Sequence, residues 1–471
     1  MPASGVTTPF VPASASLPAH RASTCSYPMP AIGWSATKSE PNPGGGAGDM
    51  PWNRWYATRS YMRSSLWIVP LVALLVEQVT IRLISANELR LDWFWLPQLA
   101  TTAAGTDGEL DTVITLTVAF IVFTFGSILV AIQVASGQLT PRIIATTLLP
   151  DNAIRFIVGL FVFTLLFAAG TKARVEEGTI PHFAVSMAMI LGIASLTAFL
   201  FLIDYTARLL RPISIVRRIG MQGARVIDAV YPHAIGEAGS SSGRLQPGLA
   251  GRTVPHNGAS GIVLAFNQRA LARFAQRSDG AVELIPKVGS FVAAGEPLFR
   301  LYGGTTAIGD HQLYAQIAIG PERTIEQDST FAFRVIVDVA VKALSKAIND
   351  PTTAVLAIDQ LHRLLRRVGR RELHDNAMFD AQGKLRVTFP TPNWEDFVHL
   401  TFREIRLYGA ENFQIARRLA AMAVDLIDTL PEARRLALRS ELDLPRRALE
   451  RSYAFPEDLA LAEQPDLQGL G

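Results

Sequence analysis

The chain has 471 residues, of which 49% are hydrophobic and only 18% are charged, and its formal net charge is +3. Soluble globular proteins carry about 25% charged residues, so this composition favours a membrane protein. The small net charge, without an arm of lysine and arginine interleaved with aromatic residues, argues against a nucleic-acid-binding protein. A single cysteine, Cys25, excludes an intramolecular disulfide framework and a cysteine-based metal cluster.

Residues 1–50 form the first predicted region. They are rich in proline, alanine, serine, threonine and glycine, and such a composition buries too little apolar surface to offset chain entropy. We therefore expect a disordered tail. No apolar segment follows a basic start, so we expect no cleaved signal peptide.

A transmembrane domain of four helices is predicted at 60–220, and its first span runs from about Leu66 to Ile84. Glu77 lies inside this span. A carboxylate there is costly unless it is neutral, paired or in contact with water. One interpretation is that Glu77 lines an ion or proton path, or pairs with a polar group of the second span. The other is that it lies close to the outer interface and is hydrated.

The second span, within 111–142, carries polar residues on two sides. It has no charged residue from Val113 to Gln138. This uncharged stretch is longer than the about 20 apolar residues that a helix needs to cross a bilayer core. At about 100° per residue, its polar and small side chains fall on two opposite sides of one helix. The first side has Thr117, Thr124, Ser127 and Gln138, and the second has Thr115, Gly126, Gln133, Ser136 and Thr140.

Lipid offers no hydrogen-bond partner, so we expect protein or water on both sides of this helix. The wall of a pore formed by several copies is one explanation. Ordinary helix–helix contact, which commonly uses serine, threonine and glycine, is the other. The residues that we assign to a pore or to polar contacts within the membrane are Glu77, Thr117, Thr124, Ser127, Gln133, Ser136 and Gln138.

The third span is predicted at about 154–169, where Asp151 and Asn152 can cap the helix, and the fourth at about 183–203. With four spans, most of the flanking arginines lie on one side of the membrane. The positive-inside rule then places both termini in the cytoplasm. These arginines are Arg54, Arg59, Arg63, Arg142, Arg208, Arg211, Arg217 and Arg218.

From Asp204 onward the chain has the character of a soluble domain, with a loop or linker at 221–260 and a β-rich segment at 261–305. The sequence VGSFVAAGEPLFRL, at 288–301, resembles the end of the lipoyl-like β-barrel. In carrier domains of that fold, a lysine at the central hairpin takes the cofactor. The corresponding turn here, Gln276–Ala281, has no lysine, so we expect a structural barrel without a cofactor.

The remainder, 306–455, is predicted to be mainly helical, and 456–471 to be a flexible tail. Asp350 followed by Pro351 is typical of a helix start. A polar cluster near this start predicts a ligand cleft, with helix capping and ion pairing as the alternative. The cleft candidates are Arg323, Gln327, Asp328, Arg334, Asp338, Asn349 and Asp350.

No constellation of catalytic residues is present. The eight histidines have no metal-binding spacing, and the sequence contains no P-loop and no GxGxxG motif. GSSSG, at 239–243, matches the GxSxG motif of serine hydrolases in sequence alone, because we expect no strand before it and no helix after it. We therefore expect no enzyme, no metal and no cofactor.

Two motifs resemble a known family. VASGQLTPR, at 134–142, follows the threonine-rich span, and GPERTIEQDSTFAFRVIVDVAVKALSKAINDPTTAVLAID occupies 320–359. Both are similar to the bacterial predicted-membrane-protein family called domain of unknown function 2254, over roughly residues 60–450. The resemblance implies a multi-pass inner-membrane protein, and it implies no activity.

Together these patterns predict an α-helical membrane protein with four transmembrane helices and an α+β cytoplasmic domain that contains a small lipoyl-like β-barrel. The favoured function is an oligomeric ion channel or transporter with a cytoplasmic gating or sensing domain. We expect a homo-oligomer in the lipid bilayer of the bacterial inner membrane, with no nucleic-acid partner. The alternative is a non-transporting membrane scaffold or envelope regulator, in which the polar residues only hold helices together.

Overall fold

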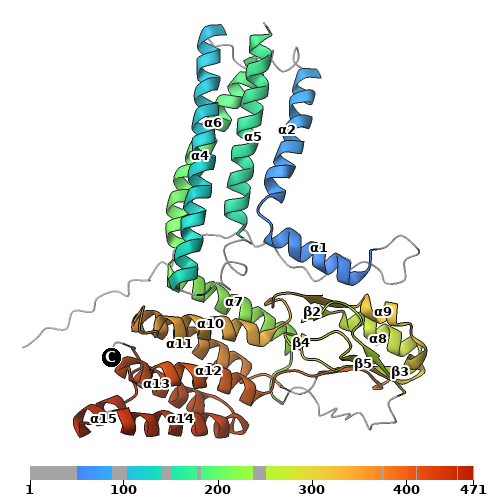
Figure 1. Ribbon diagram of the computed structural model, residues 1–471, viewed down its shortest axis with the longest axis vertical. Helices are drawn as coiled ribbons and strands as arrows, with labels where there is room; N and C mark the ends of the chain where they lie inside the picture. The colour runs from blue at the N-terminus through green and yellow to red at the C-terminus, as the bar shows by residue number, and fades with distance from the viewer. Residues whose placement is uncertain are drawn as a thin grey trace, which may run out of the picture. The chain divides into compact units, whose positions relative to one another are not determined.

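The structure, a computed structural model, describes residues 50–86, 103–138, 140, 151–177, 182–209, 211–236, 251–373, 376–409, 411–452 and 454–469. The tail predicted at 1–50 lies outside these residues except for Met50. The described chain is mostly helical, with a mixed α/β region in its second half (Figure 1).

Four helices run side by side in the first half of the described chain (Figure 1). Three of them, α4 (Ala103–Gln138), α5 (Asn152–Glu176) and α6 (His182–Leu209), are long and apolar enough to cross a membrane. The fourth, α2 (Ile68–Ala86), packs along α5. The predicted total of four spans is thus not confirmed, because it depends on α2.

Glycines permit the close approach of α2 and α5. A Cβ built on Gly159 would lie 2.9 Å from Val69 Cγ1, and one built on Gly170 would lie 2.5 Å from Ile81 Cδ1. Small residues at such contacts let two helix backbones come close together in a membrane, where packing rather than the hydrophobic effect drives association.

A proline starts the helix that follows the bundle. α6 ends at Leu209, and α7 (Pro212–Val230) begins with Pro212 in its first turn, where the missing N–H has no intrahelical partner to lose. α7 packs against α10 (Ser329–Ala343) and α11 (Pro351–Val368) in the largest apolar core. The predicted linker at 221–260 therefore begins with a helix that belongs to this core.

The rest of this core comes from the last third of the chain. α12 (Trp394–Gly409) and α13 (Phe413–Thr429) pack on α10 and α11, and α14 (Glu432–Ser452) packs on α12 and α13. A short helix, α15 (Pro456–Ala462), follows where the sequence predicted a flexible tail. Its Ala462 is fully buried next to Ala416 of α13, because two alanines let the helices approach closely.

In the described residues, eight strands form two sheets. They are β1 (Arg252–Pro255), β2 (Gly261–Phe266), β3 (Gly280–Leu284), β4 (Phe291–Val292), β5 (Pro297–Gly303), β6 (Ile317–Gly320), β7 (Asn376–Phe379) and β8 (Leu385–Phe389). The larger sheet has the order β1-β5-β3-β8-β7, with β3 and β8 parallel, and the smaller has the order β4-β2-β6. Helix α8 (Gln268–Arg277) lies between β2 and β3 in the chain. A 3₁₀ turn (Gly304–Ala307) and α9 (Asp310–Tyr314) precede β6.

The strands predicted within 261–302 are present, but the described residues form no closed barrel. β3 takes a partner from far along the chain, since Val282 pairs with Val387 of β8. The predicted hairpin tip at Gln276–Ala281 is instead the point where α8 ends and β3 begins. Asp279 there has a φ of 47°, and Gly280 follows it. The lipoyl-like barrel is therefore not confirmed.

Candidate functional site

A buried carboxylate joins three helices at one end of the bundle. Asp151 is 4% exposed and caps α5, because its side chain accepts hydrogen bonds from the backbone N–H groups of Ala153 and Ile154 at 3.0 and 3.4 Å. Its other oxygen accepts from the Tyr205 hydroxyl of α6 at 2.7 Å and from Arg218 Nη1 of α7 at 2.8 Å. We call Asp151, Tyr205 and Arg218 the Asp151 network.

The Asp151 network connects the bundle to the largest apolar core. Tyr205 lies one turn before the end of α6, and Arg218 lies in the second turn of α7, whose opposite face is buried against α10 and α11. Arg218 also donates from Nη2 to the Tyr205 hydroxyl at 3.4 Å. A buried carboxylate is strongly destabilising unless it is paired and hydrogen-bonded, so these partners hold the three helices in one arrangement.

A second buried charge ties the chain before α2 to the same end of α5. Arg155 is 7% exposed, and its Nη2 donates to the backbone oxygens of Met62 and Ser65. Met62 lies in the last turn of α1 (Trp52–Ser64). A cation at the carbonyl end of a helix is favourable because it meets unpaired carbonyls and the negative end of the dipole.

Glu77 is enclosed by protein. It is 1% exposed, accepts a hydrogen bond from Gln78 Nε2 at 2.9 Å, and faces α5 where Gly170 leaves room for it. Gly170 is two residues before Lys172, which pairs with Asp111 at 2.5 Å. Glu77 therefore lies near the end of the bundle opposite Asp151, and both interpretations of its role stay open.

The first polar side of α4 faces the bundle interior. Thr117 and Thr124 are each 1% exposed. Thr117 donates to the Val113 carbonyl at 2.7 Å, and Ser127 donates to the Thr124 carbonyl at 2.9 Å. Thr124 Oγ1 has no hydrogen-bond partner among the described residues. Most of this side is thus satisfied within α4 itself.

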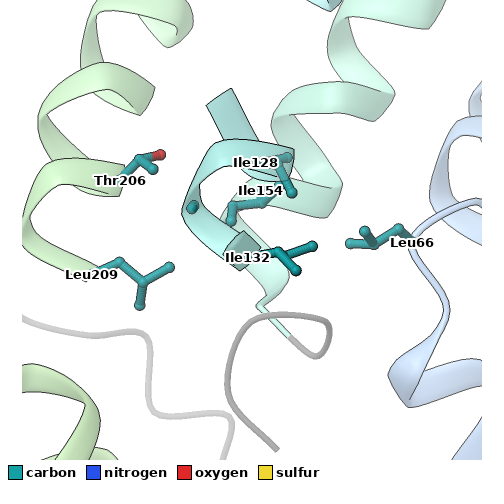
Figure 2. Close-up of a pocket in the computed structure, with 7 residues that line it drawn as sticks. Leu66, Ile128, Ile132, Ile154, Thr206 and Leu209 are labelled. Carbon is teal, nitrogen blue, oxygen red and sulfur yellow. The ribbon is translucent and has the colours of Figure 1, made fainter. Parts of the chain in front are cut away.

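The second polar side of α4 faces outward. Thr115 and Gln133 are exposed and Ser136 is half-buried, whereas Thr140, beyond the end of the helix, is buried. Gln138, which belongs to the first side, is the last residue of the helix. Ile132, next to Gln133, lines a small apolar cavity together with Ile154, in the first turn of α5 (Figure 2). Gln133 is therefore level with the end of the bundle, near Asp151, rather than with its middle. The cavity measures ≈ 10 Å³, room for about one water molecule, and offers no ion path.

One interior polar contact was not predicted from the sequence. Thr164 Oγ1 of α5 and Ser195 Oγ of α6 lie 3.0 Å apart, and both side chains are fully buried. Single hydroxyls inside apolar helices form no periodic pattern, so no sequence signal marks this pair. The sequence also pointed to Arg218 only as a flanking charge, and did not single out Tyr205.

The predicted cytoplasmic cleft candidates near the start of α10 make capping and ion-pair contacts. Asp328 caps α10 through the N–H groups of Thr330 and Phe331 and pairs with Arg323, whose Nε lies 2.8 Å from Oδ2. Gln327 Oε1 accepts from the Phe266 N–H at 3.1 Å and so fastens β2 to this loop. These three residues lie together.

The remaining cleft candidates serve other contacts. Arg334 pairs with Asp338 at 2.7 Å and with Glu404 of α12 at 2.7 Å, and its hydrogen bonds hold the pKa of the Glu404 carboxyl below its usual range. Asp350 caps α11 by accepting from the Thr353 N–H, and Asn349 before it has a φ of 47°. No group of three His, Cys, Asp or Glu residues suited to a metal ion occurs in the described chain.

Comparison with known families places these residues in context. The model of a family described as "Predicted membrane protein (DUF2254)" matches residues 63–425, which is more than half of the chain. The chain belongs to this family. The resemblance inferred from the two sequence motifs is thus confirmed, and this DUF2254 protein carries its Asp151 network and its three candidate spans inside the matched region.

Relatives of this DUF2254 protein occur in mycobacteria. The chain is 26% identical over 435 residues to the uncharacterized protein MT1328 of Mycobacterium tuberculosis (strain CDC 1551 / Oshkosh), a match that covers 87% of this chain and 81% of the relative. The uncharacterized protein Mb1321c of Mycobacterium bovis gives the same identity and coverage. No solved structure matches the chain significantly.

Proposed function

We propose that this protein is a membrane-embedded regulator that couples the state of its transmembrane bundle to the state of its soluble domain. The observation that supports this proposal is the Asp151 network. One carboxylate contacts the first turn of α5, the end of α6 and the second turn of α7. A shift of α5 against α6 would break a buried ion pair unless α7, and the core packed on it, moved as well.

The proposal includes four spans, with α2 as the first. Leu71, Leu75 and Val79 of α2 are exposed apolar side chains suited to lipid, and its other face packs on α5. An even number of spans puts both termini on one side. The excess of arginine at that side makes it the cytoplasmic face of a bacterial inner membrane.

The bundle interior favours regulation over transport. Thr117 and Ser127 donate to carbonyls of their own helix, and Thr164 pairs with Ser195, so these hydroxyls stabilise the bundle. The small cavity between α4, α5 and α6 is apolar and has no room for a hydrated ion. A regulator needs no such path, but it does need a rigid link to its soluble domain.

The test measures coupling directly. Purified protein is reconstituted into vesicles of short-chain and long-chain lipid, and backbone hydrogen exchange is followed in α7 and α10. We expect the exchange rates in both helices to change with bilayer thickness in the wild type and to become insensitive to it in Asp151→Asn. Asp204→Asn is the matched control, because in the described part of the chain Asp204 pairs with the exposed Arg208 of its own helix. Equal sensitivity in wild type and Asp151→Asn would refute the proposal.

A second candidate is an oligomeric ion channel or transporter, with the outer face of α4 at the symmetry axis. It is favoured by Gly126 and Gly137, where an added Cβ would meet nothing within 4 Å, and by the exposed Thr115 on the same side. Small residues on an open face suit a second copy. Ion flux through the same vesicles decides between the two. Flux that falls in Gly126→Leu favours the channel, whereas no flux over a range of salts favours the regulator.

A further inference from the structure

Helix α1 has two unlike faces, and the soluble domain covers only one of them. Trp52 and Tyr56 pack on the smaller sheet, where Ala265 of β2 and Ala318 of β6 are buried beneath them. The Asn53 N–H donates to the Ala315 carbonyl at 3.0 Å. Burial raises the pKa of the Tyr56 hydroxyl, which lies 3.4 Å from Thr324 Oγ1.

The other face of α1 is exposed, and it combines cationic with aromatic and apolar residues. Tyr61 and Met62 are 57% and 50% exposed, and Thr58 and Arg54 lie one and two turns before them on the same side. Trp67, after the helix, is 54% exposed and donates from its indole N–H to the Tyr61 hydroxyl at 3.2 Å. Tyrosine and tryptophan with both apolar and polar parts are enriched at membrane interfaces.

The position of α1 is set by the bundle. Arg155, in the first turn of α5, binds the backbone oxygens of Met62 and Ser65, so the last turn of α1 lies level with the start of a candidate span. Only residues 65–67 separate α1 from α2. Figure 1 shows α1 lying across the end of α2 rather than continuing it. A helix in this position runs along the membrane surface if α4, α5 and α6 cross the membrane.

The charge of this end of the molecule identifies the partner. Arg54 is exposed on α1, and Arg211 and Arg217 are exposed where the bundle passes into α7. Arginines close to a membrane are attracted to anionic lipids, and the attraction falls off within a Debye length of about 8 Å at physiological salt.

We propose that the exposed face of α1 binds anionic phospholipid headgroups of the leaflet next to the soluble domain. Tyr61, Met62 and Trp67 enter the interfacial layer, and Arg54 contacts a phosphate group. Because the opposite face of α1 is packed on β2 and β6, the bound lipid is linked through one helix to the smaller sheet. This proposal depends on the membrane position of the bundle and not on the regulatory function proposed above.

The first experiment locates the exposed face. In a Cys25→Ser background, Thr58→Cys on α1 and Arg439→Cys on the exposed surface of α14 each receive a nitroxide label, and the protein is reconstituted into vesicles containing phosphatidylglycerol. We expect the Thr58 label to collide more with oxygen than with a water-soluble nickel chelate, and the Arg439 label to show the reverse. Equal nickel accessibility of the two labels would overturn the proposal.

The second experiment tests the lipid class. Native mass spectrometry compares the phosphatidylglycerol retained by wild type and by Arg54→Gln, with Arg439→Gln as the matched control. An arginine near an anionic surface contributes a factor of about five to binding, so we expect about a fivefold loss for Arg54→Gln and none for the control. Retention equal to that of the control, or equal retention of phosphatidylcholine, would contradict the assignment.

Discussion

Replacing Asp151 by asparagine tests the energetic weight of the Asp151 network. The change removes the charge but keeps an oxygen that can accept from the Ala153 and Ile154 N–H groups, and asparagine caps helices about as well as aspartate. The loss of folding stability therefore comes from the contacts to Arg218 and Tyr205, at 2.8 and 2.7 Å. Of these two contacts, only the one with Arg218 is an ion pair, and the substitution removes its negative charge.

The size of the effect follows from burial. Breaking a buried ion pair by removing one partner costs roughly 3–5 kcal/mol, because the other charge stays buried. The Asp151 side chain is 4% exposed and that of Arg218 is 27% exposed, so the remaining guanidinium keeps some contact with water. We therefore expect Asp151→Asn to lower the free energy of unfolding by about 3 kcal/mol, the lower end of that range. Asp204→Asn should cost less than about 1 kcal/mol, because both partners of that pair are exposed.

A double-mutant cycle with Arg218→Gln gives the decisive measurement. The free energy of unfolding is measured by denaturant titration in mixed micelles for wild type, both single variants and the double variant. If the two groups stabilise the fold through each other, the double variant loses about 3–4 kcal/mol rather than the sum of both losses, about 6 kcal/mol. Losses that add to within about 0.5 kcal/mol, or a loss of less than that in Asp151→Asn, would refute this account of the junction.

Three further changes test other parts of the structure. Ser195→Ala leaves the Thr164 hydroxyl without its 3.0 Å partner and should cost about 1 kcal/mol in the same titration, while Thr164→Val in the same chain should recover part of it. Gly170→Leu places a side chain where α2 packs on α5. Cross-links between cysteines introduced into α2 and α5 should therefore be lost in this variant. Arg334 depresses the pKa of Glu404, so this contribution to stability is present above the unfolded pKa and disappears as the pH falls through the lower folded pKa. Unfolding of the purified protein below about pH 4 should therefore lose part of its pH dependence in Glu404→Gln.

The sequence was sufficient to predict features that depend on residues close together in the chain, such as membrane spans and helix caps. An uncharged segment of bilayer length predicts a span whatever surrounds it, and α4, α5 and α6 appear where such segments occur. The side chain of Asp350 before Pro351 caps a helix by contacting its own next turn, and α11 begins there as predicted. Asp151 was recognised as a cap for the same reason. Local chemistry of this kind is visible without knowing the fold.

Contacts between distant segments could not be predicted in this way. The pairing of Val282 with Val387 depends on two strands that are separated by most of the soluble domain, so the local strand pattern suggested a self-contained barrel instead. Asp151 reaches Tyr205 and Arg218 only because α6 and α7 fold back on the start of α5. Neither the strand pairing nor the contacts of Asp151 with Tyr205 and Arg218 produce a periodic pattern in the sequence.

The two polar sides of α4 illustrate the same limit in a single helix. Angular position correctly separates Thr124, which is buried among the helices, from Gln133, which is exposed. Depth in the bilayer does not follow from the angle. The contact of Ile132 and Ile154 around one cavity puts Gln133 at the end of the bundle, where water can hydrate its amide, and the exposed residues nearer the middle, such as Val122 and Leu129, are apolar. The outer face of α4 therefore suits lipid along most of its length. A channel at this face would have to use Gly126 and the backbone around it rather than the amide that first suggested a pore.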